Sequence, residues 1–383
     1  MKTDGGSLQR RSAASLALAA LAACGGGTTV PLPARIVASR PAEPAPEPRV
    51  NRYPAATRSP VPVPLANESE PDREVCGQAD ATLDAVAARL ATDPDRDPDH
   101  VTTLLREGGE PHVRPRVVRA ASLDAARASL KSMHGATTRC GLFRGASGIV
   151  ALLVEAPADL DPLPTHARTG TWLAFSATLN VPVSGARLVV LGPRGAPHTV
   201  PTTLAPGHVR ARFALEAPGA FTVQLVGDRP DGPEPLLEAR IFADVPDDAV
   251  TPAAPGEEAG NDADALERMT AVLRTSEALP ALRRMPELDA VAEEHVRKMH
   301  AAGRIAHDSG DGNLVARLED DGIVARLVGE NVARAQTVAL AHRALHASPS
   351  HRSNLLNPRF REAGFAAVES DGVVWVCEVF LGR

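Results

Sequence analysis

Aromatic residues are scarce in this chain, making up only 3% of its 383 residues, whereas apolar residues as a whole make up 44%. Buried cores are therefore expected, built mainly from Val, Leu and Ala. A surplus of basic residues is also lacking, because 41 Lys and Arg residues stand against 47 Asp and Glu residues and the net charge is −6. Since nucleic-acid binding depends on a positive surface, we expect no nucleic-acid partner.

Long hydrophobic runs are missing as well. Residues 12–23 form a short Ala- and Leu-rich run that follows Arg10 and Arg11 and is too short to span a bilayer. The run ends in Leu21-Ala22-Ala23-Cys24, which resembles the lipobox of bacterial lipoproteins. The alternative is an ordinary secretory signal with a chance cysteine. The lipobox predicts a signal peptide over residues 1–24 and lipid attachment at Cys24.

Cysteines are few, with Cys76, Cys140 and Cys377 remaining besides Cys24. Export implies an oxidising compartment, in which disulfides persist. Cys76 and Cys140 flank one segment and could close a loop, although three cysteines allow three pairings. Their spacing excludes a CxxC zinc or redox motif.

The chain is too long for one ordinary domain, and we predict a multidomain protein. Pro-rich composition between Cys24 and residue 72 indicates an extended tether. Helical spacing of Leu83, Val86 and Leu90 and a later apolar strand predict a small α/β domain, either a degenerate copy of the C-terminal domain or an unrelated fold. Short strands with a Pro218-Gly219 turn then predict an immunoglobulin-like β-sandwich that acts as a spacer or in adhesion. The predicted parts are residues 1–24 (signal peptide), 25–72 (linker), 73–162 (small α/β domain), 166–248 (β-sandwich), 249–262 (linker) and 263–383 (C-terminal domain).

The C-terminal part combines a strong amphipathic helix with a final hairpin. Pro286 suits the first turn of that helix, and apolar residues then recur at helical spacing up to Met299. Asp371-Gly372 lies between apolar runs and predicts a hairpin. Both faces of the last strand are apolar, so helices should cover both faces of a small antiparallel sheet.

Several motifs then follow in order. They are His307, Gly329-Glu330-Asn331, the Ser348-Pro349-Ser350-His351-Arg352 segment with Asn354-Leu355-Leu356-Asn357-Pro358, and the strand Val374-Trp375-Val376-Cys377-Glu378-Val379-Phe380. In order and spacing this series resembles the bacterial branch of the CAP superfamily (cysteine-rich secretory protein, antigen 5 and pathogenesis-related 1; SCP-like). The resemblance implies that the C-terminal domain is an α-β-α sandwich with a cleft.

The same resemblance implies that two histidines and one or two glutamates line the cleft and can bind a divalent metal such as zinc. His307, Glu330 and His351 match these positions, but the second glutamate has no clear equivalent. Ser350 replaces a usual Gly, and Leu345 a usual Trp. Independently, imidazole and carboxylate groups are natural zinc ligands. Glu378 could join them as a ligand or orient a histidine.

Each of these residues also has a structural interpretation. His307 could be solvated, Glu330 could bind loop amides, His351 could cap a helix, and Glu378 could reach solvent. His295 lies on an apolar helix face and is expected to be a satisfied core histidine rather than a ligand. His342 and His346 have the i, i+4 spacing that can bind zinc, but a solvated helix face is favoured for them.

The function favoured by these patterns is binding. A lipid-anchored, extracytoplasmic protein, periplasmic or on the cell surface, would hold an envelope lipid, glycan or peptide in the CAP cleft. The first alternative is a metal-dependent hydrolase that uses His307, Glu330 and His351. The second is a structural envelope protein. No Ser-His-Asp or Cys-His pattern suggests covalent catalysis. The balance leans away from an enzyme, and apart from the metal no cofactor is expected.

Overall fold

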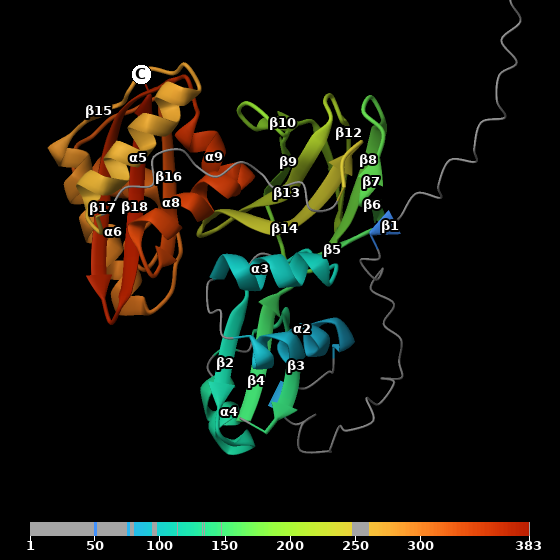
Figure 1. Ribbon diagram of the computed structural model, residues 1–383. Helices are drawn as coiled ribbons and strands as arrows, with labels where there is room; N and C mark the ends of the chain where they lie inside the picture. The colour runs from blue at the N-terminus through green and yellow to red at the C-terminus, as the bar shows by residue number, and fades with distance from the viewer. Residues whose placement is uncertain are drawn as a thin grey trace, which may run out of the picture. The chain divides into compact units, whose positions relative to one another are not determined.

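The structure is a computed structural model that describes residues 50–51, 75–76, 80–93, 98–246 apart from 113, 132, 134 and 147, and 260–382. The predicted signal peptide with Cys24, and most of both predicted linkers, lie outside the described residues. Figure 1 shows the elements in chain order.

The first group of elements, here called the α/β segment, covers the described residues 75–155. Its three strands form an antiparallel sheet in the order β2-β4-β3. One face packs against α2 and α3, and the other against α4. Asp80 caps α2 and Ser122 caps α4 through their side-chain oxygens. The elements are α2 (Ala81–Thr92), α3 (Pro98–Glu107), β2 (Arg116–Ala120), α4 (Leu123–Leu130), β3 (Thr138–Gly145) and β4 (Gly148–Glu155).

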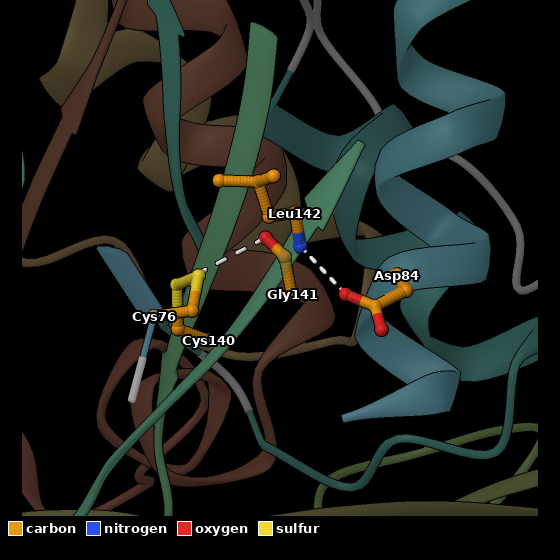
Figure 2. Close-up of a disulfide and its surroundings, with 5 residues drawn as sticks. All are labelled: Cys76, Asp84, Cys140, Gly141 and Leu142. Atoms are coloured by element: carbon orange, nitrogen blue, oxygen red, sulfur yellow. Dashed lines mark hydrogen bonds between the residues drawn. A yellow bond between two sulfur atoms is a disulfide. The ribbon is translucent and has the colours of Figure 1, made fainter. Parts of the chain in front are cut away.

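A disulfide joins Cys76 to Cys140 on β3, the pairing that the sequence suggested, with the two Cα atoms 5.2 Å apart. Figure 2 shows this disulfide and, beside it, the bond from the Leu142 backbone N–H to Asp84 Oδ1 at 2.6 Å. The disulfide therefore ties residues 75–76, which precede α2, to the edge strand β3.

The second group, here called the β segment, covers residues 158–243 and consists of two sheets around one core. The sheet orders are β10-β9-β13-β14-β7 and β11-β12-β8-β5. The strands are β5 (Ala158–Leu160), β6 (Leu163–Pro164), which pairs with β1 (Val50–Asn51), β7 (His166–Ala167), β8 (Trp172–Leu179), β9 (Gly185–Leu191), β10 (His198–Val200), β11 (Thr202–Ala205), β12 (His208–Ala214), β13 (Gly219–Arg229) and β14 (Gly232–Ala243).

The C-terminal segment, residues 260–382, has helices on both faces of a sheet in the order β15-β17-β18-β16. Residues from α5, α8 and α9 form the core on one face, and residues from α6 and α7 form the core on the other. The expected α-β-α layering is therefore present. The elements are α5 (Ala263–Ser276), β15 (Arg283–Arg284), α6 (Pro286–Ala302), α7 (Leu314–Asp320), β16 (Leu327–Ala335), α8 (Val338–Ala347), α9 (Pro349–Leu355), β17 (Phe360–Ser370) and β18 (Val373–Gly382).

Local sequence signals explain the ends of several of these elements. Helix α6 begins at Pro286 and ends at Gly303, whose φ of 66° needs a residue without Cβ. Asp371 and Gly372 both have positive φ, as a tight hairpin between β17 and β18 requires. Helix α5 begins after Asp262, which is its N-cap and accepts from the Ala265 N–H.

The α/β segment repeats the arrangement of the C-terminal segment. Its elements α2, α3, β2, α4, β3 and β4 follow the order of α6, α7, β16, α8, β17 and β18. The sheet order β3-β4-β2 corresponds to β17-β18-β16, and all these pairs are antiparallel. Helix α9 has no counterpart in the described part of the α/β segment. Of the two alternatives that the sequence left open, this correspondence favours a degenerate copy.

The repeat extends to side chains. Leu83-Asp84-Ala85-Val86-Ala87 in α2 and Leu288-Asp289-Ala290-Val291-Ala292 in α6 are identical pentapeptides. Asp84 Oδ1 accepts from the Leu142 N–H, and Asp289 Oδ1 accepts from the Phe365 N–H at 2.8 Å. A Cβ on Gly141 or Gly364 would lie 2.2 Å from the carbonyl carbon of Leu83 or Leu288. Each helix therefore contacts its strand through a glycine.

We expect Gly141→Ala and Gly364→Ala to destabilise the protein by about 2 kcal/mol or more each, because the helix backbone must move away from the strand. Chemical denaturation measures the loss. Gly192→Ala is the control, since its Cβ would meet only an ordinary 3.4 Å contact with Phe221. Equal stability of all three variants would refute the close helix-strand contact.

Candidate functional site

Glu330 lies on β16 with both of its carboxylate oxygens bound by protein donors. His307 Nδ1 donates to Glu330 Oε2 at 2.7 Å, and Arg317 Nη2 donates to Glu330 Oε1. Burial raises the pKa of Glu330, but the hydrogen bond from His307 and the charge of Arg317 lower it below its ordinary value. Glu330 is therefore an ionised carboxylate at neutral pH. The sequence placed it on a loop, whereas it lies in a strand.

His307 lies in the connection between α6 and α7, and its side chain is 22% exposed. Because Nδ1 donates to the carboxylate of Glu330, the neutral form of the His307 ring has its lone pair on Nε2. Arg317 also donates to the His307 carbonyl at 3.4 Å, which holds the loop to α7. The imidazole thus has a fixed orientation, and its Nε2 takes no part in this hydrogen-bond network.

A second set of side chains lies next to Glu330 and Arg317 in the interior. His295 on α6 is fully buried, with Nδ1 2.7 Å from Asp311 Oδ2 and Nε2 2.9 Å from the Ala306 carbonyl. Asp311 also lies 3.7 Å from Arg317 Nη1. The interpretation of His295 as a satisfied core histidine is confirmed. Sequence reasoning missed Asp311 and Arg317, for which no motif gives a signal.

Glu378 lies on the opposite face of the sheet from Glu330. It pairs with Asn331 across β18 and β16, while Glu330 pairs with Val379. Asn331 Nδ2 donates to Glu378 Oε2 and Thr270 Oγ1 donates to Oε1, both at 2.9 Å. Burial raises the pKa of Glu378 to about 7. Glu378 therefore neither joins His307 and Glu330 nor reaches solvent, because adjacent strand residues point to opposite faces.

His351 lies in the first turn of α9, partly buried, with Nδ1 2.9 Å from Ser348 Oγ. Burial, together with the proximity of the basic groups His307 and Arg114, lowers the pKa of His351 to about 3, so its ring is neutral at neutral pH. Its carbonyl accepts from Asn331 Nδ2 at 3.2 Å. His351 is not a helix cap, since Ser348 is the N-cap residue. His307 thus contacts Glu330 directly, and His351 lies near enough to His307 for the two rings to interact electrostatically.

Comparison with known proteins gives a family for the C-terminal segment. Residues 268–379 match the family model of the Cysteine-rich secretory protein family, CAP. The C-terminal segment is a CAP domain. No curated protein matches the chain.

Three solved structures are similar to parts of the chain. An outer surface protein from Borrelia burgdorferi is 23% identical and has a TM-score of 0.30, with 31% of this chain and 91% of that chain covered. An extracellular protein containing a SCP domain from Bacillus anthracis is 15% identical, with a TM-score of 0.30 and coverage of 84% and 99%. A cysteine-rich secretory protein from Staphylococcus aureus is 13% identical, with a TM-score of 0.28 and coverage of 75% and 91%.

The residues of the CAP domain do not fit a divalent cation in this arrangement. Glu330 has both oxygens engaged, and Ser348 engages one nitrogen of His351. Within the described residues, no three His, Cys, Asp or Glu side chains are grouped so that they could hold a metal. A cation would have to displace existing hydrogen bonds.

One surface pocket lies elsewhere, in the β segment. Its lining comes from the β8–β9 and β11–β12 connections and contains no titratable side chain. It therefore offers no acid-base or metal chemistry, and we do not connect it with the CAP site.

His342 and His346 are buried in the CAP domain, and the expectation of a solvated helix face is wrong. They lie on the inner side of α8, and within the described part of the chain neither nitrogen of His342 has a hydrogen-bond partner. Burial lowers the pKa of His342 to about 4, and burial with the charge of Arg352 lowers the pKa of His346 to about 3. Both rings are neutral, apolar-like parts of the core.

These two histidines predict acid sensitivity. Their pKa values in the folded state lie below the value of about 6.5 in an unfolded chain, so their contribution is complete above pH 6.5 and is lost as pH falls toward 4. We expect His342→Leu to reduce the loss of stability between pH 7 and pH 5 by about 2 kcal/mol. Denaturation curves at both pH values measure the effect, with the exposed His198→Leu as control. A loss unchanged from wild type would show that His342 does not titrate with unfolding.

Proposed function

We propose that this protein is an exported bacterial lipoprotein, anchored through Cys24, whose CAP domain binds an envelope or extracellular ligand beside His307 and His351. The small α/β domain, the β-sandwich and the Pro-rich tether carry this domain away from the membrane. In the described part of the chain, no helix has the length and apolar character needed to cross a membrane. In this proposal the anchor is the set of acyl chains at Cys24, because several acyl chains hold a protein stably on a membrane where one does not.

The hydrogen bond between His307 Nδ1 and Glu330 carries the binding proposal. A buried, ionised carboxylate that is also held by Arg317 fixes the ring and leaves Nε2 as an acceptor for a ligand donor. His351, neutral and close by, adds a second polar group. Hydroxyl and amide donors suit such a site, and glycans, peptides and lipid head groups all carry them.

The main alternative is a hydrolase. A carboxylate that orients a histidine is also the arrangement that prepares an imidazole to act as a general base. The version that depends on a metal requires the cation to replace Arg317 or His307 on Glu330, which the existing bonds oppose.

Ligand binding can be tested by adding soluble peptidoglycan fragments, or vesicles of anionic phospholipid, to the full chain with 15N-labelled histidine. We expect one probe to shift the His307 resonances, and His307→Phe to weaken its binding about tenfold, the value of one hydrogen bond. His300→Gln, an exposed change on α6, is the control. Unchanged affinity in His307→Phe would exclude this site.

Zinc calorimetry on the full chain separates the metal alternative. We expect no micromolar binding, because no donor set among the described residues is free to receive the ion. Micromolar binding that is lost in His351→Ala would instead support the hydrolase and replace the binding proposal.

Lipid attachment has its own test. When the gene is expressed in bacteria fed a labelled fatty acid, the wild-type protein should take up label and sediment with membranes. Cys24→Ser should lose both properties, because only the thiol can carry the diacylglycerol. Label retained in Cys24→Ser would place the lipid elsewhere.

A further inference from the structure

Strand β13 of the β segment buries polar side chains on the face away from its own core. Phe221, Val223 and Leu225 belong to the core between the two sheets. Gln224 points to the other face and is only 1% exposed, and its partner across the pair, Glu238, is 4% exposed. Since buried polar groups require hydrogen bonds, Gln224 and Glu238 need polar partners on this face.

Helix α9 of the CAP domain supplies that cover, and it satisfies Gln224 completely. Gln224 Oε1 accepts from the Ser350 N–H at 3.0 Å. Its Nε2 donates to Ser348 Oγ at 3.2 Å and to Glu238 Oε2 at 3.1 Å. The orientation of the amide is unambiguous, because the reversed group would put oxygen against a carboxylate and NH₂ against an N–H.

The bond from Gln224 occupies one of the two acceptor positions of Ser348 Oγ, and the hydroxyl proton of Ser348 remains to donate. Two acceptors are within reach, His351 Nδ1 at 2.9 Å and Ser350 Oγ at 3.5 Å. The contact with His351 Nδ1 is the shorter, so we assign the Ser348 hydroxyl proton to it. His351 Nδ1 then accepts, and the ring proton of the neutral His351 resides on Nε2.

A second contact from the same hairpin reaches the other site histidine. Gly232, at the start of β14, has φ +115°, and a Cβ there would lie 3.0 Å from His307 Cβ. At the far end, Glu238 also accepts from Arg106 on α3. The β13–β14 hairpin therefore contacts His307 directly and His351 through Ser348.

We propose that Gln224 is a positioning residue of the CAP site: it orients Ser348 and thereby fixes the tautomer that His351 presents to a ligand. The β-sandwich is then part of the binding site and more than the spacer that its sequence suggested. The biological meaning rests on the proposed function, whereas the hydrogen-bond chain is testable without any ligand.

The test uses 15N-labelled histidine in the full chain at pH 7. In wild type we expect His351 to show one tautomer with its proton on Nε2 and a rigid ring. In Gln224→Leu, and equally in Ser348→Ala, the two ring-nitrogen resonances should move toward each other as tautomers average, and 13C relaxation should show a mobile ring. His295 should not change, because its partners are intact.

Thr222→Val is the matched control, since Thr222 lies two residues away on the same buried strand and should leave His351 unchanged. If Gln224→Leu does not fold, Gln224→Asn decides the question, because the shorter amide keeps its polarity but does not reach Ser348. An unchanged His351 spectrum in a folded Gln224 variant overturns the proposal. A changed His351 spectrum together with no binding of any probe would support the positioning role of Gln224 and refute the proposed function.

Discussion

The CAP site depends on one buried negative charge. Burying the Glu330 carboxylate is expensive unless each oxygen meets a donor, and Arg317 and His307 meet that requirement. This single constraint explains why α7 lies against β16, why the loop after α6 is held down, and why His307 has a defined orientation. The orientation of His307, the histidine that a ligand would contact, therefore follows from the need to neutralise a buried charge.

The strand geometry separates this charge from a second carboxyl group. Glu330 and Asn331 are neighbours on β16 and point to opposite faces, so Glu378 belongs to the network of Asn331 and Thr270. One carboxyl group has a cationic partner and a lowered pKa, whereas the other has only neutral partners and a raised pKa. The sheet thus keeps an ionised acid toward α6 and α7 and, toward α5, an acid whose pKa is raised to about 7.

Much of the fold could be predicted from the sequence, because periodicity and caps are local signals. Helix α6, the final hairpin and the layers on both faces followed from Pro286, Gly303 and the pattern of β18. The supporting residues of the site could not be predicted. Asp311 and Arg317 meet Glu330 only through tertiary packing, and the burial of His342 and His346 depends on α5 and α9 covering α8. Short strands such as β10 carry too few residues for a pattern.

The α/β segment allows a comparison within one polypeptide. In its sheet Gly141 pairs with Leu152, and Leu152 pairs with Val117 on the next strand. The corresponding residues of the CAP domain are Gly364, Val379 and Glu330, respectively. Leu90 takes the place of His295, since the shared pentapeptides align α2 with α6. The same architecture thus persists with hydrocarbon where the CAP domain carries charge. The shared element order is therefore compatible with apolar or with ionic side chains at these positions, and of the two segments the C-terminal one combines it with Glu330 and His295.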